Sequence, residues 1–290
     1  MIAFLETRAN TQNFQSTHEY LTELKKAHKS DPEVERLINL VTNGLTCFWR
    51  DEPQLEAFRV ALKETAARKG RTVDVWCAGC STGEEVYTIA MIAEEENVAV
   101  RILGTDLNTE FLHHAETAQY GLWSLRRLSE PRQTGYFEQV QPDTWKVRES
   151  LINHTEFERH NILERPPTFR PTADIILCRN VLIYFTESAR RRAVENFGVG
   201  LHRDGYLLLG SSEHLDDEWG LFRASRQASG FVYRHAAKNA GTTMPIVLDD
   251  LDDFDAPPAF VQERQEETLD FDDYEAILRA AEAEADVVLW

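Results

Sequence analysis

Apolar positions in the middle of the chain follow two periods in turn, and this alternation predicts an α/β fold. Short β-branched or leucine-rich runs predict strands at 72–77, 100–106, 173–178, 205–211 and about 230–234. Apolar residues spaced three and four apart predict helices over about 83–96, 108–118 and 187–200. Because strands and helices alternate, we expect a mainly parallel, doubly wound sheet with helices on both faces.

The N-terminal part has helical periodicity and no strand pattern. Apolar spacings of three and four run through residues 15–45, and Asp31-Pro32 predicts a helix start because proline fits the first helical position. A further helix is predicted from Leu55 to Lys69, ended by Gly70. We therefore expect residues 1–70 to form a helical domain and a linker helix.

Two other segments depart from the alternation. Residues 120–158 contain Pro131, Pro142 and short alternating runs such as Trp145-Lys-Val-Arg and Thr155-Glu-Phe-Glu, which predict a small antiparallel β insertion within a domain of residues 71–235. Residues 236–290 predict an acidic linker and tail, because they are too charged and too poor in apolar groups to form a core. An apolar stripe near the end of this tail predicts an amphipathic C-terminal helix.

Charge and composition narrow the class of protein. The chain has 290 residues, 42% of them hydrophobic, which is enough to bury a full core. Of the net charge of −18, the tail carries −12, because its 15 acidic residues face three basic ones. The body is thus only mildly acidic, and no basic footprint for nucleic acid is visible. No apolar run reaches the ~20 residues of a membrane span, and the N-terminus does not match a signal peptide, so we expect a cytoplasmic protein without membrane insertion.

Four cysteines occur in or beside the candidate motifs and do not form a spread disulfide framework. They are Cys47, Cys77, Cys80 and Cys178. Cys77 and Cys80 have the spacing of a metal or redox pair, but no second Cys-x-x-Cys accompanies them. We interpret all four as small packing residues and predict no metal site.

The loop after the first predicted strand has the composition of a nucleoside site. It reads Ala78-Gly-Cys-Ser-Thr-Gly-Glu-Glu85, without the glycine pattern or the lysine of a diphosphate cradle, and its carboxylates would repel a diphosphate. Asp106 ends the next strand, where doubly wound folds place an acid that holds ribose hydroxyls. A ligand with positive charge and a ribose, such as S-adenosylmethionine, fits both. The alternative is that the glycines serve a tight turn, the glutamates cap a helix and Asp106 caps a strand end.

Five blocks together resemble one protein family, over about residues 4 to 235. These blocks are Thr46-Cys-Phe-Trp-Arg50, Ala78-Gly-Cys-Ser-Thr-Gly-Glu-Glu85, Thr105-Asp106 with Asn161, Cys178-Arg-Asn-Val-Leu-Ile-Tyr-Phe185 and Gly205-Tyr-Leu-Leu-Leu-Gly-Ser-Ser-Glu213. In order and spacing they resemble the CheR family of chemotaxis receptor methyltransferases. The resemblance implies a class I S-adenosylmethionine-dependent methyltransferase fold. It also implies formation of glutamate methyl esters on the cytoplasmic helical domains of chemoreceptors, with S-adenosylhomocysteine as product.

The resemblance also implies which residues form the site. Thr46 and Arg50 would touch the cofactor or the methyl-transfer position, Glu85 and Asp106 its amino acid and ribose parts. The remaining pocket residues would be Gly79, Asn161, Ile162, Arg179 and Asn180.

From chemistry, a glutamate carboxylate with a pKa of about 4.3 is already ionised near neutral pH, so methyl transfer needs no general base. Arg50 is then a candidate to align the acceptor carboxylate, and Tyr184 is the second catalytic candidate. Phe48, Trp49, Tyr184 and Phe185 are candidates for a dry aromatic wall. The alternative, which we prefer for Phe48 and Phe185, is a place in the plain core.

Some positions depart from the family pattern. The asparagine usual two residues before the motif threonine is replaced by Gly44, with Asn43 one step earlier. The helical domain lacks most of a first helix, and its evident basic residues are Arg8, Lys25, Lys26 and Lys29. Two other interpretations therefore stay open. One is a cofactor-binding signalling module with a reduced substrate face that binds partners through the acidic tail. The other is a methyltransferase for a small carboxylic acid. Under any of these interpretations the tail could also dock on this chain's own body.

Overall fold

The computed structural model describes residues 2–24, 26, 31–167, 172–215 and 219–236. The predicted C-terminal amphipathic helix lies outside these residues. Along the part of the chain that is described, no helix combines the length and the apolar character needed to cross a membrane.

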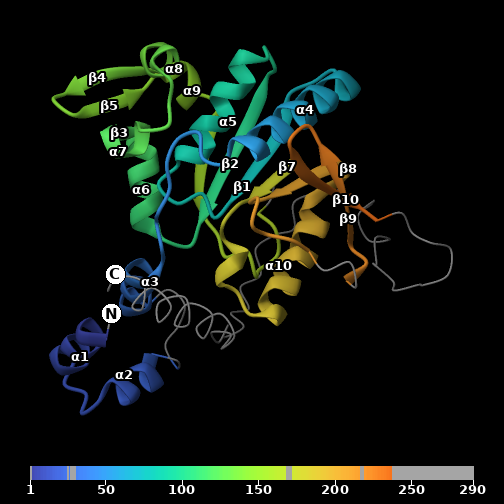
Figure 1. Cartoon of the computed structure of the whole chain (residues 1–290). Coiled ribbons are helices and arrows are strands. Elements are labelled where there is room, and N and C mark those ends of the chain that lie inside the picture. The colour runs from blue at the N-terminus through green and yellow to red at the C-terminus, as the bar shows by residue number, and fades with distance from the viewer. Residues whose placement is uncertain (1, 25, 27–30, 168–171, 216–218, 237–290) are drawn as a thin grey trace, which may run out of the picture.

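A seven-stranded sheet forms the centre of the molecule, in the order β6, β2, β1, β7, β8, β10, β9 (Figure 1). The strands are β1 (Val73–Ala78), β2 (Val100–Asp106), β6 (Thr155–Arg159), β7 (Ala173–Cys178), β8 (Leu201–Leu209), β9 (Phe222–Gln227) and β10 (Gly230–His235). The five strands from β6 to β8 in this order run parallel, and β10 pairs antiparallel with both of its neighbours, β8 and β9. The predicted doubly wound α/β fold is confirmed.

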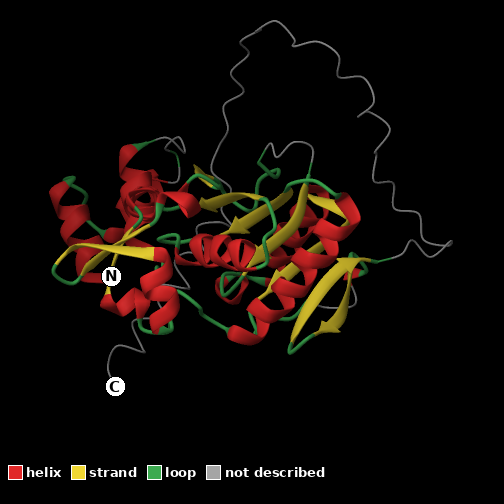
Figure 2. Ribbon diagram, turned by 90° about the horizontal axis from the view of Figure 1, so that it is seen from above, coloured by secondary structure: helices red, strands yellow, loops and turns green. Residues whose placement is uncertain are grey.

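Helices cover both faces of this sheet (Figure 2). Along β1, Val75 and Cys77 join the core beneath α4 (Glu52–Lys69) and α5 (Glu84–Glu95). The neighbouring Trp76 and Ala78 join the opposite core beneath α10 (Glu187–Gly200). All residues of β1 are buried because both of its faces are covered. α6 (Thr109–Thr117) follows β2 along the chain and packs against β2 and β6.

Residues 155–159 correct one of the sequence predictions. The run Thr155-Glu-Phe-Glu was expected in the antiparallel insertion, but it pairs in parallel with β2 as the edge strand β6 of the main sheet. Edge exposure gives β6 an alternating polar pattern, which resembles that of a small antiparallel strand. The strand β9 was not predicted, because four of its six residues are exposed and polar or small.

A second, three-stranded antiparallel sheet in the order β3, β5, β4 projects beside the main sheet (Figure 1). It contains β3 (Gln119–Gly121), β4 (Phe137–Gln141) and β5 (Thr144–Val147), with the short helices α7 (Leu122–Leu125), α8 (Glu130–Tyr136) and α9 (Glu149–Ile152). The antiparallel insertion is therefore present, and its described strands end before residue 155.

Three N-terminal helices have a small core of their own. They are α1 (Ile2–Thr11), α2 (Thr17–Leu24) and α3 (Pro32–Val41). The predicted helix start is confirmed, since the Asp31 side chain accepts a hydrogen bond from the Glu33 backbone N–H and Pro32 is the first helical residue. α1 was not predicted from periodicity, although Leu5 and Ala9 pack against α2 and α3. Gly70 ends α4 with a φ of 61°, as expected.

Candidate active site

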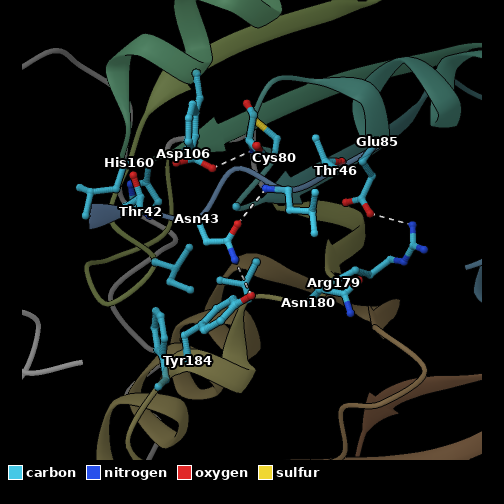
Figure 3. A pocket seen from close by; sticks show the side chains of 18 of the residues that line it. Thr42, Asn43, Thr46, Cys80, Glu85, Asp106, His160, Arg179, Asn180 and Tyr184 are labelled. Carbon is cyan, nitrogen blue, oxygen red and sulfur yellow. Dashed lines mark hydrogen bonds and ion pairs between the residues drawn. The ribbon is translucent and has the colours of Figure 1, made fainter. Parts of the chain in front are cut away.

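One pocket lies where β1, β2 and β7 end, at the carboxyl edge of the sheet (Figure 3). Doubly wound folds bind their ligands at this edge. The structure brings all of the predicted site residues to this pocket: Thr46, Arg50, Gly79, Glu85, Asp106, Asn161, Ile162, Arg179, Asn180 and Tyr184.

The turn between β1 and α5 depends on Gly79. Its φ is +75°, and a Cβ there would lie 2.5 Å from Cγ2 of Val181. The N–H groups of Gly79 and Cys80 both donate to the carbonyl of Thr105, over 2.8 and 2.9 Å. These bonds tie the loop to the end of β2 and leave the backbone close to the pocket.

Asp106 ends β2 and is held by backbone donors. Ser81 N–H donates to its Oδ2 over 2.8 Å, and Asn108 N–H donates to its Oδ1 over 3.0 Å. Burial raises the pKa of the Asp106 carboxyl, and these donors oppose the rise. Since a carboxylate has about four acceptor positions, Asp106 keeps acceptor capacity for ligand hydroxyls.

Glu85 lies in the first turn of α5 and pairs with a buried arginine. Arg179 Nη1 contacts Glu85 Oε2 at 2.7 Å, and Arg179 Nη2 donates to the carbonyl of Arg50. Burial raises the pKa of the Glu85 carboxyl, and Arg179 partly offsets this effect. Glu84, expected beside it in the site, instead turns away and accepts from Ser124 and Thr82. Only one of the two glutamates therefore faces the pocket.

The loop after β7 is fixed by a carboxylate that the sequence analysis did not select. Glu213 accepts the N–H groups of Asn180 over 2.6 Å and of Val181 over 3.0 Å. Asn180 has a left-handed φ of 60°, so these bonds hold a conformation that few residues adopt. Glu213 is the last residue of the fifth family block, and its place in that block was the sequence signal that could have identified it.

Several residues of the loop 42–50 also line the pocket, and Figure 3 shows Thr46 near Glu85. Arg50 Nη1 donates to the carbonyl of Leu45 over 2.8 Å, so the Arg50 side chain folds back onto the backbone of its own loop. Asn43 Nδ2 donates to the Tyr184 hydroxyl over 3.0 Å (Figure 3). Gly44 is packed so closely that a Cβ would lie 2.5 Å from Cζ of Phe111.

The aromatic residues divide differently from the prediction. Tyr184 and Phe185 line the pocket, but Phe48 and Trp49 do not. Phe48 is fully buried in the core, and Trp49 lies there too with the Arg132 guanidinium 3.5 Å from its ring centroid. The wall role is therefore wrong for Trp49, the preferred core role of Phe48 is confirmed, and Phe185 lines the pocket against the preference for a core role. Phe111 lines the pocket instead and was missed because it lies within a helix, outside every motif.

The far end of the pocket is mainly apolar. Leu107, Phe111 and Ile162 line it, with the polar groups of His160 and Asn161 beside them. Burial lowers the pKa of His160, so its imidazole is neutral near pH 7. Asn161 Oδ1 accepts from the Leu163 N–H over 3.0 Å, which fixes the local turn. A flat, uncharged ring system suits this end.

The cysteines and N-terminal basic residues occupy other environments. All four cysteines are buried free thiols, and burial raises the pKa of Cys77 and Cys80 well above the ordinary value. Arg8 is paired with Glu33 and Lys26 with Glu23, while Lys25 and Lys29 lie outside the described residues. Arg8 is thus committed to the helical core and is not a free receptor-binding cation.

Comparisons with known proteins agree with this geometry. The family described as "CheR methyltransferase, SAM binding domain" matches residues 44–231. The chain is 33% identical over 205 residues to a chemotaxis protein methyltransferase of Salmonella typhimurium, covering 68% of this chain and 69% of that protein. It is 30% identical over 222 residues to one of Borreliella burgdorferi, covering 73% and 78%. A relative from Vibrio cholerae, chemotaxis protein methyltransferase 2, is 29% identical over 242 residues, covering 80% and 84%. The chain belongs to the CheR family of S-adenosylmethionine-dependent methyltransferases.

Proposed function

We propose that this enzyme methylates glutamate side chains on the cytoplasmic helical domains of chemoreceptors, as part of chemosensory adaptation. The observation that carries the proposal is one pocket that is lined by the carboxylates of Glu85 and Asp106 and also by Arg50 and Tyr184. The carboxylates suit a cationic nucleoside. Arg50 and Tyr184 suit an incoming carboxylate.

The residues present fit S-adenosylmethionine. Glu85 would hold the ammonium group, Asp106 the ribose hydroxyls, and the apolar end with Ile162 the adenine. Gly79 and Asn180, which both have a positive φ, would line the ligand at the turns after β1 and β7. When bound, S-adenosylmethionine supplies an electrophilic methyl group on a sulfonium centre.

The chain's own contribution to transfer is alignment and exclusion of water. Arg50 and Tyr184 would hold the acceptor carboxylate by charge and hydrogen bonding. Since the carboxylate is ionised near neutral pH, no side chain has to remove a proton. A poorly hydrated pocket favours a reaction in which opposite charges cancel, because water stabilises the separated charges more than the transition state.

The division of the chain into domains, and its location, are also part of this proposal. We propose a helical domain and linker helix over residues 1–70, a methyltransferase domain over residues 71–235 and an acidic tail over residues 236–290, in a protein of the cytoplasm.

We propose further that the tail docks on a partner or on this chain's own body. Its charge of −12 supports an electrostatic contact. Deleting residues 240–290 would raise the methylation rate at low salt if the tail covers the site, and would weaken a partner interaction otherwise.

Transfer of labelled methyl from S-adenosylmethionine tests the function. Cytoplasmic receptor fragments should become labelled, and mild base should release the label because glutamyl methyl esters are base-labile. Free glutamate and other small carboxylic acids serve as the matched acceptors. Labelling of the small acids alone would indicate the small-molecule methyltransferase. Cofactor binding without any transfer would indicate the signalling module.

A further inference from the structure

The side chain of Asn43 connects the motif loop to Tyr184, and both of its amide atoms are used. Leu45 N–H donates to Asn43 Oδ1 over 2.9 Å, and Asn43 Nδ2 donates to the Tyr184 hydroxyl over 3.0 Å. A backbone N–H is only a donor, so the amide atom that faces Leu45 must be the oxygen. The orientation of the amide is thereby fixed, and its NH₂ group faces Tyr184.

This orientation decides what the Tyr184 hydroxyl does. A phenol has one proton to donate and lone pairs that accept. Because the Asn43 NH₂ group only donates, it occupies a lone pair and leaves the phenolic proton unused. Within the described residues, no hydrogen bond takes up that proton. The hydroxyl is therefore set as a donor in the pocket that Arg50 also lines.

We propose that Asn43 is a positioning residue that holds the Tyr184 hydroxyl as a donor to the acceptor carboxylate. A carboxylate only accepts hydrogen bonds, so a tyrosine turned the other way would meet it with a lone pair and repel it. Donation to the oxygen that does not attack would fix the plane of the carboxylate and leave the attacking oxygen free. The inference rests on the proposed function, since it concerns how that function's acceptor is held.

Substitutions at Asn43 separate this role from simple support of the loop. Asn43→Asp keeps the bond from Leu45 N–H but gives Tyr184 an acceptor, so the phenolic proton turns away from the pocket. Asn43→Ala removes both bonds without adding charge. We expect each to lower kcat, Asn43→Asp by about tenfold, which corresponds to one hydrogen bond. The dissociation constant of S-adenosylmethionine should change less than about twofold.

The decisive test repeats the Asn43 substitutions in a protein that already carries Tyr184→Phe and so lacks the hydroxyl. If Asn43 acts through the hydroxyl, Asn43→Asp and Asn43→Ala should cost nothing further once the hydroxyl is gone. An equal loss of kcat in the Tyr184 and Tyr184→Phe backgrounds for both variants would show that Asn43 only supports the loop. Unchanged kcat in Asn43→Asp would also overturn the proposal.

An NMR measurement on the full chain tests the amide orientation without any substrate. The side-chain Nδ2–H resonance of Asn43 should lie downfield in the unaltered protein and move upfield in Tyr184→Phe. No movement would overturn the proposal. If the unaltered enzyme transfers no methyl to receptor fragments while the resonance moves as expected, the proposed function fails and the arrangement of the Asn43 amide stands.

Discussion

The two sides of the pocket are built in different ways. The strand wall, formed by Gly79, Glu85, Asp106 and Arg179, rests on the ends of β1, β2 and β7 and on the first turn of α5. The loop wall, formed by residues 42–50 together with Tyr184, has hydrogen bonds within the loop and to Tyr184. It is also bonded to other elements, since Ser81 donates to the Gly44 carbonyl and Arg179 donates to the Arg50 carbonyl. The carboxylates of the strand wall are held in place by backbone donors or by Arg179. The strand wall is thus placed by the ends of strands, and the loop wall by hydrogen bonds that join a loop to separate parts of the fold.

This difference matches the two tasks of a methyltransferase. Binding a constant cofactor favours groups that the core keeps fixed, as strand ends do. Aligning a variable acceptor depends on side chains that act mainly at the moment of transfer. Substitutions in the strand wall should therefore change cofactor affinity, and those in the loop wall should change kcat.

Arg50→Ala should give the largest effect. Loss of its guanidinium removes the cation that would align the acceptor, and we expect kcat to fall by about 10²- to 10³-fold, as when a preorganised donor is removed. Cofactor affinity should change little. Steady-state kinetics would measure kcat, and calorimetry would measure cofactor affinity. Arg50→Lys is the control, because it keeps the positive charge but loses the paired N–H donors of the guanidinium. Equal losses in affinity and kcat would place Arg50 on the cofactor's side and break the comparison.

Asp106→Ala should give the next largest effect, on binding. Hydrogen bonds to a charged group are worth about 1.5–3 kcal/mol each, so we expect the dissociation constant of S-adenosylmethionine to rise by about 10- to 100-fold. Asp106→Asn keeps one acceptor oxygen, so its dissociation constant should lie between those of the unaltered protein and Asp106→Ala. Calorimetry measures the constants, and thermal unfolding checks that the turn at Ser81 and Asn108 survives. Unchanged affinity in Asp106→Ala would refute a ribose role.

The strand wall could be predicted from sequence, because parallel strands bring their carboxyl ends to one edge. Asp106 follows from that rule. Glu85 follows from the acidic composition of the loop, which did not separate it from Glu84, and the roles of Gly79 and Arg179 follow from the family resemblance. The sheet was predictable for the same reason, except for β6 and β9, whose exposed residues give edge strands a polar pattern.

The loop wall resisted prediction because its contacts join distant segments. Asn43 and Tyr184 are 141 positions apart, and no local pattern pairs them. Nor could the motif say which way its aromatic residues point. Trp49 has a φ of 58°, and this turn sends its ring into the core while Arg50 lines the pocket.

Gly44→Ala should sharpen the comparison by displacing the loop wall alone. The new methyl would lie 2.5 Å from Cζ of Phe111, so the ring or the loop has to move. Overpacking of this kind costs about 1–3 kcal/mol of unfolding free energy. We expect kcat to fall by about tenfold through loss of the Asn43 to Tyr184 bond. Gly44→Ala combined with Phe111→Ala should recover kcat in the methylation assay at saturating S-adenosylmethionine, although loss of Phe111 from the pocket lining should weaken cofactor binding. No recovery of kcat would indicate that contact with the Phe111 ring is not responsible for the loss.

The smallest expected effect is a pH dependence of the strand wall. Burial raises the pKa of both Glu85 and Asp106 above their ordinary values. The folded protein without cofactor thus binds protons more tightly than the unfolded chain, and its stability falls as pH rises from the ordinary carboxyl pKa to the raised one. A cationic ligand favours the ionised carboxylates, so binding should release protons and tighten with rising pH through the same window. The tightening is limited to about tenfold per pH unit for each proton released. Calorimetry in two buffers of different ionisation enthalpy would count these protons, and Asp106→Asn should release fewer. Affinity that weakens as pH rises through the window would show that the strand wall binds the cofactor with its carboxyls protonated.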